Sequence, residues 1–195
     1  MLMHDTTLER TTSCTGLVSA MTLADLQANC FLKNARDGQV TDDRVPTYEQ
    51  VAEYANSVRK PIAPEIKLPN SDLSDAELAD FVQTTQDSGE ATRTYVQSFE
   101  GSTVFPRLHA LAPDLATIFL SSYNTDPRVI TAAGSGIASP EYHSVNATWL
   151  ARYHAAGLKV WTWTVDDAPS IQRMWTLGAN GIFSNYPTVA RALLR

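Results

Sequence analysis

The segment KVWTWTVDDAPS, residues 159–170, combines a short apolar run with the start of a helix, and this pattern is the main indication of the fold. β-branched and aromatic residues fill 159–165, as is typical of a buried strand. Asp167 and Pro169 then begin a helix that ends before Gly178, because Asp caps helix starts, proline suits the first turn and glycine follows the last turn. We therefore expect a strand and a helix in direct succession.

The same pattern of an apolar run followed by a helix recurs along the chain. Further apolar runs occupy 61–67, 94–99, 116–122 and 181–186, with a weaker one at 135–140. Helical patterns occupy 47–58, 74–88, 146–156 and the C-terminal NYPTVARALL. Strands that alternate with helices predict βα units and a parallel sheet. The runs are apolar almost throughout, which is typical of strands covered on both faces.

Two of the helices have capping boxes at their starts. These are TYEQ at 47–50 and SDAE at 74–77, in which the first and last side chains satisfy each other's backbone N–H groups. An apolar stripe at helical spacing follows each box. The first stripe is Val51, Tyr54, Ala55 and Val58, and the second is Leu78, Phe81, Val82 and Thr85.

Several runs end in polar or aromatic residues. These are Glu65 and Lys67, Gln97 and Ser98, Ser121 and Ser122, Trp163, and Ser184 and Asn185. A (β/α)8 barrel builds its active site from residues at the C-terminal ends of its strands. We expect such a barrel as a single domain over residues 1–195. The chain has only about six credible strands and is shorter than the usual length of about 250 residues.

Composition restricts the function. With 44% hydrophobic residues and a net charge of −6, the chain is an ordinary globular protein whose charge repels nucleic acid and anionic membranes. No apolar run approaches 18 residues, so we expect no membrane span. No charged and apolar leader precedes Met1, so we expect no signal peptide in this chain.

The residues that could carry chemistry each have a structural alternative. Glu65 and Lys67 lie two apart on a strand and face the same side, either as an interior ion pair or as a metal-binding carboxylate beside a phosphate-binding lysine. His4, beside Asp5, is more often structural than catalytic in such a context. Trp163 shares a face with Trp161 and belongs either to the core or to the wall of a pocket.

Other polar residues fit structural roles better. Asp166 and Asp167 could bind metal, but helix capping before Pro169 is the favoured interpretation. His109, His143 and His154 have no partner at a telling spacing, so we interpret them as structural or surface residues. Cys14 and Cys30 are the only cysteines, and the residues alone leave a disulfide and two separate buried thiols equally open.

Taken in order, these segments resemble the glycerophosphodiester phosphodiesterase family over essentially the whole chain. MHDTTLERTT, residues 3–12, is similar to the second-histidine motif of that family, and PEIK, residues 64–67, is similar to its Glu-x-Lys strand. VPTYEQV resembles the lead into the next helix. VWTWTVDD and LGANGIFSNYP resemble the C-terminal signature, with Asn185 where an Asp is common.

The resemblance implies a barrel that hydrolyses glycerophosphodiesters to glycerol 3-phosphate and an alcohol, in lipid and glycerol metabolism. It implies that His4 is one of two catalytic histidines. It also implies that Glu65 is a ligand of a divalent metal, Mg²⁺ or Ca²⁺, that Lys67 holds the phosphate and that Trp163 lines the pocket. The expected partner is a small glycerophosphodiester, and neither nucleic acid nor a membrane span is expected.

The chain departs from the family pattern at its start. The His-Arg-Gly turn and the Glu-x-Asp pair of the family precede its HD motif, whereas here only Met1, Leu2 and Met3 do so. We therefore expect a barrel that lacks its first one or two βα units, with impaired metal binding and no significant activity. Some exported relatives have cysteines placed like Cys14 and Cys30, so the resemblance implies a disulfide and a secreted or periplasmic parent protein.

Two other functions are weighed against this one. The chain could be a non-catalytic remnant of the same fold that serves as a binding or interaction module. It could also be a sphingolipid head-group lyase, since related barrels use the same cyclic-phosphate route. The EIK segment and the Leu-x-Arg-Thr-Thr turn fit the glycerol family better.

Overall fold

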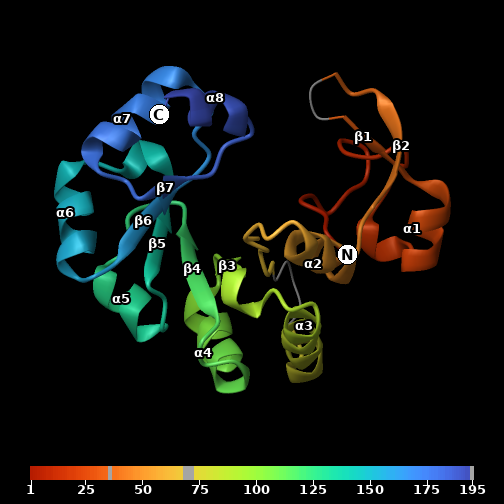
Figure 1. Ribbon diagram of the computed structural model, residues 1–195, viewed down its shortest axis with the longest axis horizontal. Helices are drawn as coiled ribbons and strands as arrows, with labels where there is room; N and C mark the ends of the chain where they lie inside the picture. Colours follow the sequence, from red (N-terminus) through yellow and green to blue (C-terminus); the bar gives the residue numbers. More distant parts are fainter. Residues whose placement is uncertain (35–36, 68–72, 194–195) are drawn as a thin grey trace. The chain divides into compact units, whose positions relative to one another are not determined.

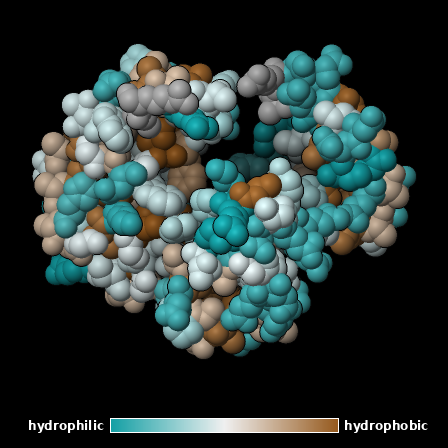
Figure 2. Space-filling view, viewed as in Figure 1, coloured by the Kyte–Doolittle hydropathy of each residue, from teal (hydrophilic) through white to brown (hydrophobic). Residues whose placement is uncertain are grey.

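The computed structural model describes residues 1–34, 37–67 and 73–193 (Figure 1). The chain divides into two compact units, Met1–Arg59 and Lys60–Arg195, and each is described by itself. That residues 1–195 form one phosphodiesterase domain stays a prediction. In the face shown in Figure 2, polar and weakly apolar residues predominate, and strongly hydrophobic residues form separate small patches.

The first unit combines short helices with a hairpin. Its elements are η1 (Val18–Ala20), α1 (Leu23–Asn29), β1 (Phe31–Lys33), β2 (Val40–Arg44) and α2 (Tyr48–Ser57). Strands β1 and β2 pair antiparallel, with Phe31 opposite Arg44, whose guanidinium carbon lies 3.4 Å from the centre of the Phe31 ring. The sequence did not predict this hairpin, because VTDDR in β2 has no apolar alternation.

Cys14 and Cys30 form a disulfide in the first unit. The S–S distance is 2.02 Å, and the Cα atoms are 5.3 Å apart. Cys30 is fully buried with Leu8 and Leu26, and Cys14 packs against this small core. The disulfide that the resemblance implied is therefore present, and both cysteines of the chain take part in it.

We expect the double variant Cys14→Ser, Cys30→Ser to be less stable than the oxidised protein by about 3 kcal/mol, because the bond closes a loop of about 16 residues in the unfolded chain. Denaturant unfolding of the first unit, followed by circular dichroism, measures the loss. Intact mass after alkylation, with and without reduction, checks the bond itself. Two freely alkylated thiols in unreduced protein from an oxidising compartment would contradict the prediction.

Helix α2 begins as its capping box predicts, but its buried face differs from the predicted stripe. The Thr47 hydroxyl accepts a hydrogen bond from Gln50 N at 3.1 Å, and Thr47 N donates to Gln50 Oε1 at 3.0 Å. Ala52 and Ala55 are buried, whereas Tyr54 is 68% exposed. The buried face is therefore narrow and lined by small residues, which apolar spacing alone does not indicate.

The second unit consists of alternating strands and helices. In order these are α3 (Asp75–Asp87), η2 (Ala91–Arg93), β3 (Tyr95–Ser98), α4 (Gly101–Leu111), β4 (Ala116–Ser121), α5 (Pro127–Ala132), β5 (Ile137–Pro140), η3 (Tyr142–Ser144), α6 (Ala147–Ala155), β6 (Lys159–Thr162), α7 (Ala168–Leu177), β7 (Gly181–Ile182) and α8 (Pro187–Leu193). The five strands are parallel and lie in the order β3-β4-β5-β6-β7, with α4, α5 and α6 along one side (Figure 1). The predicted βα pattern and parallel sheet are confirmed.

Residues 61–67 extend this sheet beyond β3 without forming a regular strand. Ile62 pairs with Thr94 and Glu65 with Gln97, both in parallel. Ile66 N donates to Gln97 O at 2.8 Å. Pro64 stands at the intervening donor position and has no N–H, so the hydrogen-bond ladder is interrupted there.

The two faces of the sheet pack into separate cores. The outer face contacts the helices through Val96, Phe119, Ala138 and Val160. The inner face gathers Tyr95, Ile118, Leu120, Ile137, Trp161, Trp163 and Phe183. Tyr95 of β3 and Trp161 of β6 have ring centres 5.2 Å apart, although two strands lie between them. In a flat sheet such strands would be about 14 Å apart, so curvature and the reach of the rings together bring them into contact.

The sheet is thus an arc of a barrel. Within the described part of the second unit, its outer members are residues 62–66 and β7, and no pairing between them closes a ring. Among the described residues, no helix combines the length and apolarity that crossing a membrane requires.

Asp126 caps α5 and couples stability to pH. Its carboxylate accepts hydrogen bonds from Arg128 N at 2.9 Å and Arg128 Nη2 at 3.0 Å. The hydrogen bond from the Arg128 side chain is the main cause that lowers the pKa of Asp126 from 3.8 to about 2. Because the pKa is lower in the folded state, the stabilisation is present above pH about 4 and is lost as the pH falls toward 2.

We therefore expect Asp126→Asn to melt at a lower temperature than the parent protein at pH 6, with a difference that shrinks below pH 4. Thermal unfolding over a series of pH values measures this difference. Asp80→Asn, at an exposed position within α3, serves as the control. A difference that is the same at every pH would contradict the prediction.

Candidate active site

Glu65 and Lys67 lie at the C-terminal end of the segment that extends the sheet. The Lys67 ammonium is 3.6 Å from Glu65 Oε2, so the two side chains share one side, as their spacing predicts. The side chain of Glu65 is 19% exposed and that of Lys67 is 37% exposed. Because both side chains are partly accessible, the pair is open to a ligand and is not a closed interior ion pair.

Trp163 follows β6 and is fixed in place by three neighbours. Its indole N–H donates to Ser139 O at 2.8 Å, and its backbone bridges to Glu141 at the end of β5. Its ring meets Phe99 edge to face, with centres 5.4 Å apart. Trp163 is thus held in place and partly buried just after β6.

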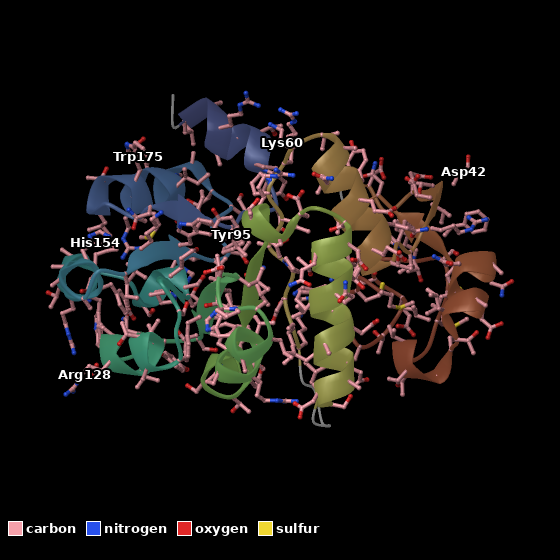
Figure 3. The ribbon with its side chains drawn as sticks, turned by 60° about the horizontal axis from the view of Figure 1, so that its bottom comes forward. Asp42, Lys60, Tyr95, Arg128, His154 and Trp175 are labelled. Carbon is pink, nitrogen blue, oxygen red and sulfur yellow. A yellow bond between two sulfur atoms is a disulfide. The ribbon has the colours of Figure 1, made fainter. Side chains whose placement is uncertain are left out.

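These residues all lie at the C-terminal ends of the strands and of the segment that extends the sheet. Since Glu65 pairs with Gln97, Lys67 and Phe99 both lie two residues beyond that pair on neighbouring segments. Phe99 in turn contacts Trp163. We call Glu65, Lys67, Phe99 and Trp163 the inner rim. Tyr95 lies in the middle of the second unit, whereas Arg128, His154 and Trp175 lie at its periphery (Figure 3).

His4 belongs to the first unit, where Asp5 orients it. His4 Nδ1 lies 2.7 Å from Asp5 Oδ1, and Asp5 also accepts a hydrogen bond from Arg10 Nη2 at 2.9 Å. The pKa of Asp5 is held well below its usual range, mainly by the hydrogen bond from Arg10 and next by the one from His4. The carboxylate of Asp5 thus binds both His4 and Arg10, which explains the spacing of these three residues in the motif.

Asp166 and Asp167 have the structural roles that the sequence favours. Asp167 is the N-cap of α7 and accepts from Ser170 N at 2.8 Å. Asp166 accepts from Ser184 Oγ at 3.1 Å, and from both Asn185 N and Asn185 Nδ2 at 2.8 Å. Burial acts to raise the pKa of Asp166, but these hydrogen bonds prevail and lower it. Asn185 thus anchors the loop after β7.

The described residues do not fit a divalent metal site. Among them, no group of three or more His, Cys, Asp or Glu side chains could hold a metal ion. Mg²⁺ and Ca²⁺ need several oxygen ligands, whereas the carboxylate of Glu65 faces the ammonium of Lys67. The expected metal, with Glu65 as its ligand, stays a prediction, and no step below is derived through it.

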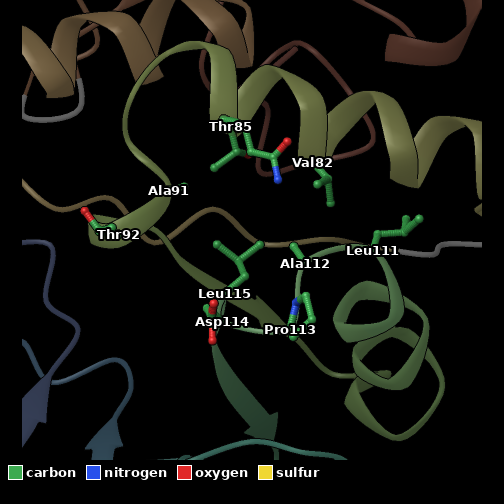
Figure 4. Close-up of a pocket in the computed structure, with 10 residues that line it drawn as sticks. Val82, Thr85, Ala91, Thr92, Leu111, Ala112, Pro113, Asp114 and Leu115 are labelled. Atoms are coloured by element: carbon green, nitrogen blue, oxygen red, sulfur yellow. The ribbon is translucent and has the colours of Figure 1, made fainter.

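A cavity of about 290 Å³ lies elsewhere in the second unit (Figure 4). It is formed by α3, η2 and the loop from α4 to β4, and its wall includes Val82, Leu111, Pro113 and Leu115. These elements meet at the N-terminal ends of β3 and β4, opposite the inner rim. The cavity is therefore separate from the candidate site.

The sequence analysis missed one pair of side chains at the same ends of the strands. Glu141 and His143 follow β5, and His143 Nδ1 lies 2.7 Å from Glu141 Oε1. A Glu-x-His spacing directly after a predicted strand was the available signal. By contrast, His154 contacts Asn180 at 3.2 Å on the helical side, in agreement with a structural role.

A curved parallel sheet with a carboxylate, a lysine and a tryptophan at the C-terminal ends of its strands defines a barrel-type α/β protein with its site in the usual place. The model of the glycerophosphoryl diester phosphodiesterase family matches residues 1–189. The chain belongs to this family of enzymes.

Individual relatives agree with this assignment. A glycerophosphodiester phosphodiesterase of Bacillus subtilis is 27% identical over 204 residues, which cover 96% of this chain and 69% of the relative. A phosphodiesterase of Oleispira antarctica, solved in complex with the product sn-glycerol-3-phosphate, has a TM-score of 0.86 at 20% identity, over 98% of this chain and 78% of that one. A glycerophosphodiester phosphodiesterase of Agrobacterium tumefaciens has a TM-score of 0.78 at 19% identity, over 97% and 79%. The fold is therefore that of the TIM-barrel phosphodiesterases.

Proposed function

We propose that the chain is a phosphoric diester hydrolase that cleaves glycerophosphodiesters to sn-glycerol 3-phosphate and an alcohol, in lipid and glycerol metabolism. The observation that carries the proposal is the accessible Glu65–Lys67 pair on the inner rim, on a segment that pairs with the strand before Phe99, whose ring contacts Trp163. Family membership and the product bound by the Oleispira antarctica relative support the substrate class.

Each residue of the proposal has a chemical task. Lys67 would bind a non-bridging phosphate oxygen, where its charge offsets the charge that develops in the transition state. Trp163 would line the pocket on the apolar side of the glycerol unit. His4, oriented through Nδ1 by Asp5, would transfer a proton to or from an alcohol oxygen. Glu65 would position the Lys67 ammonium in the absence of the metal that the resemblance implies.

We also propose that the 195 residues by themselves turn over slowly. The first catalytic histidine, its arginine and two of the three metal carboxylates that the resemblance implies have no counterpart in the sequence. Within the described part of the second unit, residues 62–66 and β7 are the outer members of the sheet, and such edges would in addition favour association between copies, since sheet edges recruit other strands.

The test is an assay of sn-glycerol 3-phosphate released from glycerophosphocholine, with and without Mg²⁺ or Ca²⁺, together with size-exclusion chromatography. We expect little product and a substantial aggregated or dimeric fraction. A monomer with rapid, metal-dependent turnover would contradict this expectation while supporting the assigned reaction. Release of a different product from the diester would contradict the assigned reaction.

We further propose an oxidising compartment, periplasmic or extracellular, for the parent protein. The observation that supports it is the buried Cys30 in a disulfide with Cys14. Fractionation of the producing cell, with antibody detection, tests the location.

A further inference from the structure

The carboxylate of Glu141 holds His143 at two points. Glu141 Oε1 lies 2.7 Å from His143 Nδ1, and Glu141 Oε2 accepts a hydrogen bond from His143 N at 2.9 Å. Because an ionised carboxylate can only accept, His143 Nδ1 must carry the proton in this contact. The other ring nitrogen, Nε2, is then the atom through which His143 can exchange a proton with a ligand.

The pair is attached to the inner rim at the backbone level. Glu141 bridges to Trp163, and Tyr142 N donates to Trp163 O at 3.1 Å. The Tyr142 ring lies against the imidazole of His143, with centres 3.9 Å apart. The side chain of His143 is 73% exposed, so its imidazole is accessible to a ligand.

Three charged groups come from the elements packed against the loop of His143. Glu141 belongs to the same loop, Asp167 is the N-cap of α7, and Arg173 lies within α7. Arg173 donates to the backbone oxygens of Tyr142 and Val145, which ties the loop to α7. Hydrogen bonds from Ser170 are the main cause of the lowered pKa of Asp167, and the nearby His143 lowers this pKa further. His143 is thus close to two carboxylates.

We infer that His143 is a proton-transfer residue of the proposed hydrolase and acts on the leaving alcohol; this inference rests on the proposed function. The neighbouring glycerol hydroxyl bonds to phosphorus and gives its proton to the base proposed above, His4. The bond from phosphorus to the leaving alcohol oxygen breaks with its electron pair on that oxygen, which takes the proton from Nε2 of protonated His143. Water then attacks the cyclic phosphate and gives a proton to Nε2 of His143, while the glycerol oxygen that leaves takes the proton back from His4, so the proton balance closes.

The alternative is a local cap with no chemical role, and the structure contains a matched example of one. Asp126 holds the backbone N–H and the side chain of Arg128, two residues later, in the same way that Glu141 holds His143. Arg128 lies at the periphery of the second unit, and arginine cannot act as a general acid at neutral pH (Figure 3). Arg128→Gln is therefore the control for His143→Gln.

The first experiment compares two esters of glycerol phosphate, one with choline and one with p-nitrophenol. A general acid contributes about 10²–10⁴-fold when the leaving oxygen needs a proton, and p-nitrophenolate leaves without one. We expect His143→Gln to slow the choline ester by about 10²-fold or more and to leave the p-nitrophenyl ester near the parent rate, with Arg128→Gln unchanged on both. Equal losses on both esters, or no loss on either, would overturn the inference.

The second experiment does not depend on turnover. Proton–nitrogen NMR spectra of the histidine rings and of Lys67 are recorded while sn-glycerol 3-phosphate is added to the whole chain. We expect saturable shifts of the His143 ring and of Lys67, and none of the His154 ring. A response of Lys67 without His143 would overturn the inference but keep the proposed function. No response of either residue would overturn both.

Discussion

In a chain completed with the missing family motifs, replacing Lys67 with Met is expected to lower turnover of glycerophosphocholine by about 10²-fold or more. The reason is that a positioned cation that offsets transition-state charge is removed while the bulk of the side chain is kept. The partly exposed ammonium on the inner rim makes this the largest expected effect on activity. Affinity for sn-glycerol 3-phosphate, measured by calorimetry, should fall as well.

Two further variants, one at Glu65 and one at Lys60, separate a catalytic role of Lys67 from a structural one. Glu65→Gln should also lower the rate, because it removes the charge that positions Lys67 at nearly constant shape. Lys60→Met, at an exposed position of the same unit, should change neither rate nor affinity. If Lys67→Met and Glu65→Gln both melt at lower temperatures but turn over and bind normally, the pair is a structural ion pair.

Replacing Phe105 with Ala is expected to destabilise the second unit by about 3–5 kcal/mol, because it leaves a cavity in a fully packed core. Phe105 is completely buried and packs edge to face against Phe119, with ring centres 6.2 Å apart. A methyl group added at Gly101 would lie 2.7 Å from the Phe105 ring, which shows how closely this layer is filled.

Denaturant unfolding with a near-ultraviolet signal measures this loss. Leu111→Ala is the matched control, since Leu111 lies on the same helix α4 and is 45% exposed. We expect it to cost less than about 1 kcal/mol, as surface truncations usually do. A loss for Phe105→Ala as small as that of the control would show that this layer is not packed as described.

Features fixed over a few residues were predictable from the sequence. The capping boxes at Thr47 and Ser74 and the cap at Asp167 start helices where they were expected. Their signals are local, because a cap needs only a side chain and the N–H groups two or three residues later. The same holds for Glu65 and Lys67, which share a side because of the period of extended backbone.

Elements that depend on distant packing were missed. Helix α4 begins with Gly101 and contains Pro106, which are poor helix signals, yet its Phe105 and Leu108 are completely buried in the core of the second unit. The Ile62–Ile66 segment was expected to be a strand, but Pro64 reduces it to two bridges. In both cases tertiary burial or a missing donor outweighed the local pattern.

The parallel βα architecture, the helix caps and the residues that share a strand face all follow from the amino-acid sequence. The contact of Phe99 with Trp163 across the arc, and the link of Glu141 and His143 to the same rim through the backbone of Trp163, follow from the folded unit instead. The two groups of features differ in the distance along the chain over which they are set. Capping and strand alternation follow from bonds within a few residues, whereas contacts between strands follow from register and sheet curvature, which the packing of the whole unit sets.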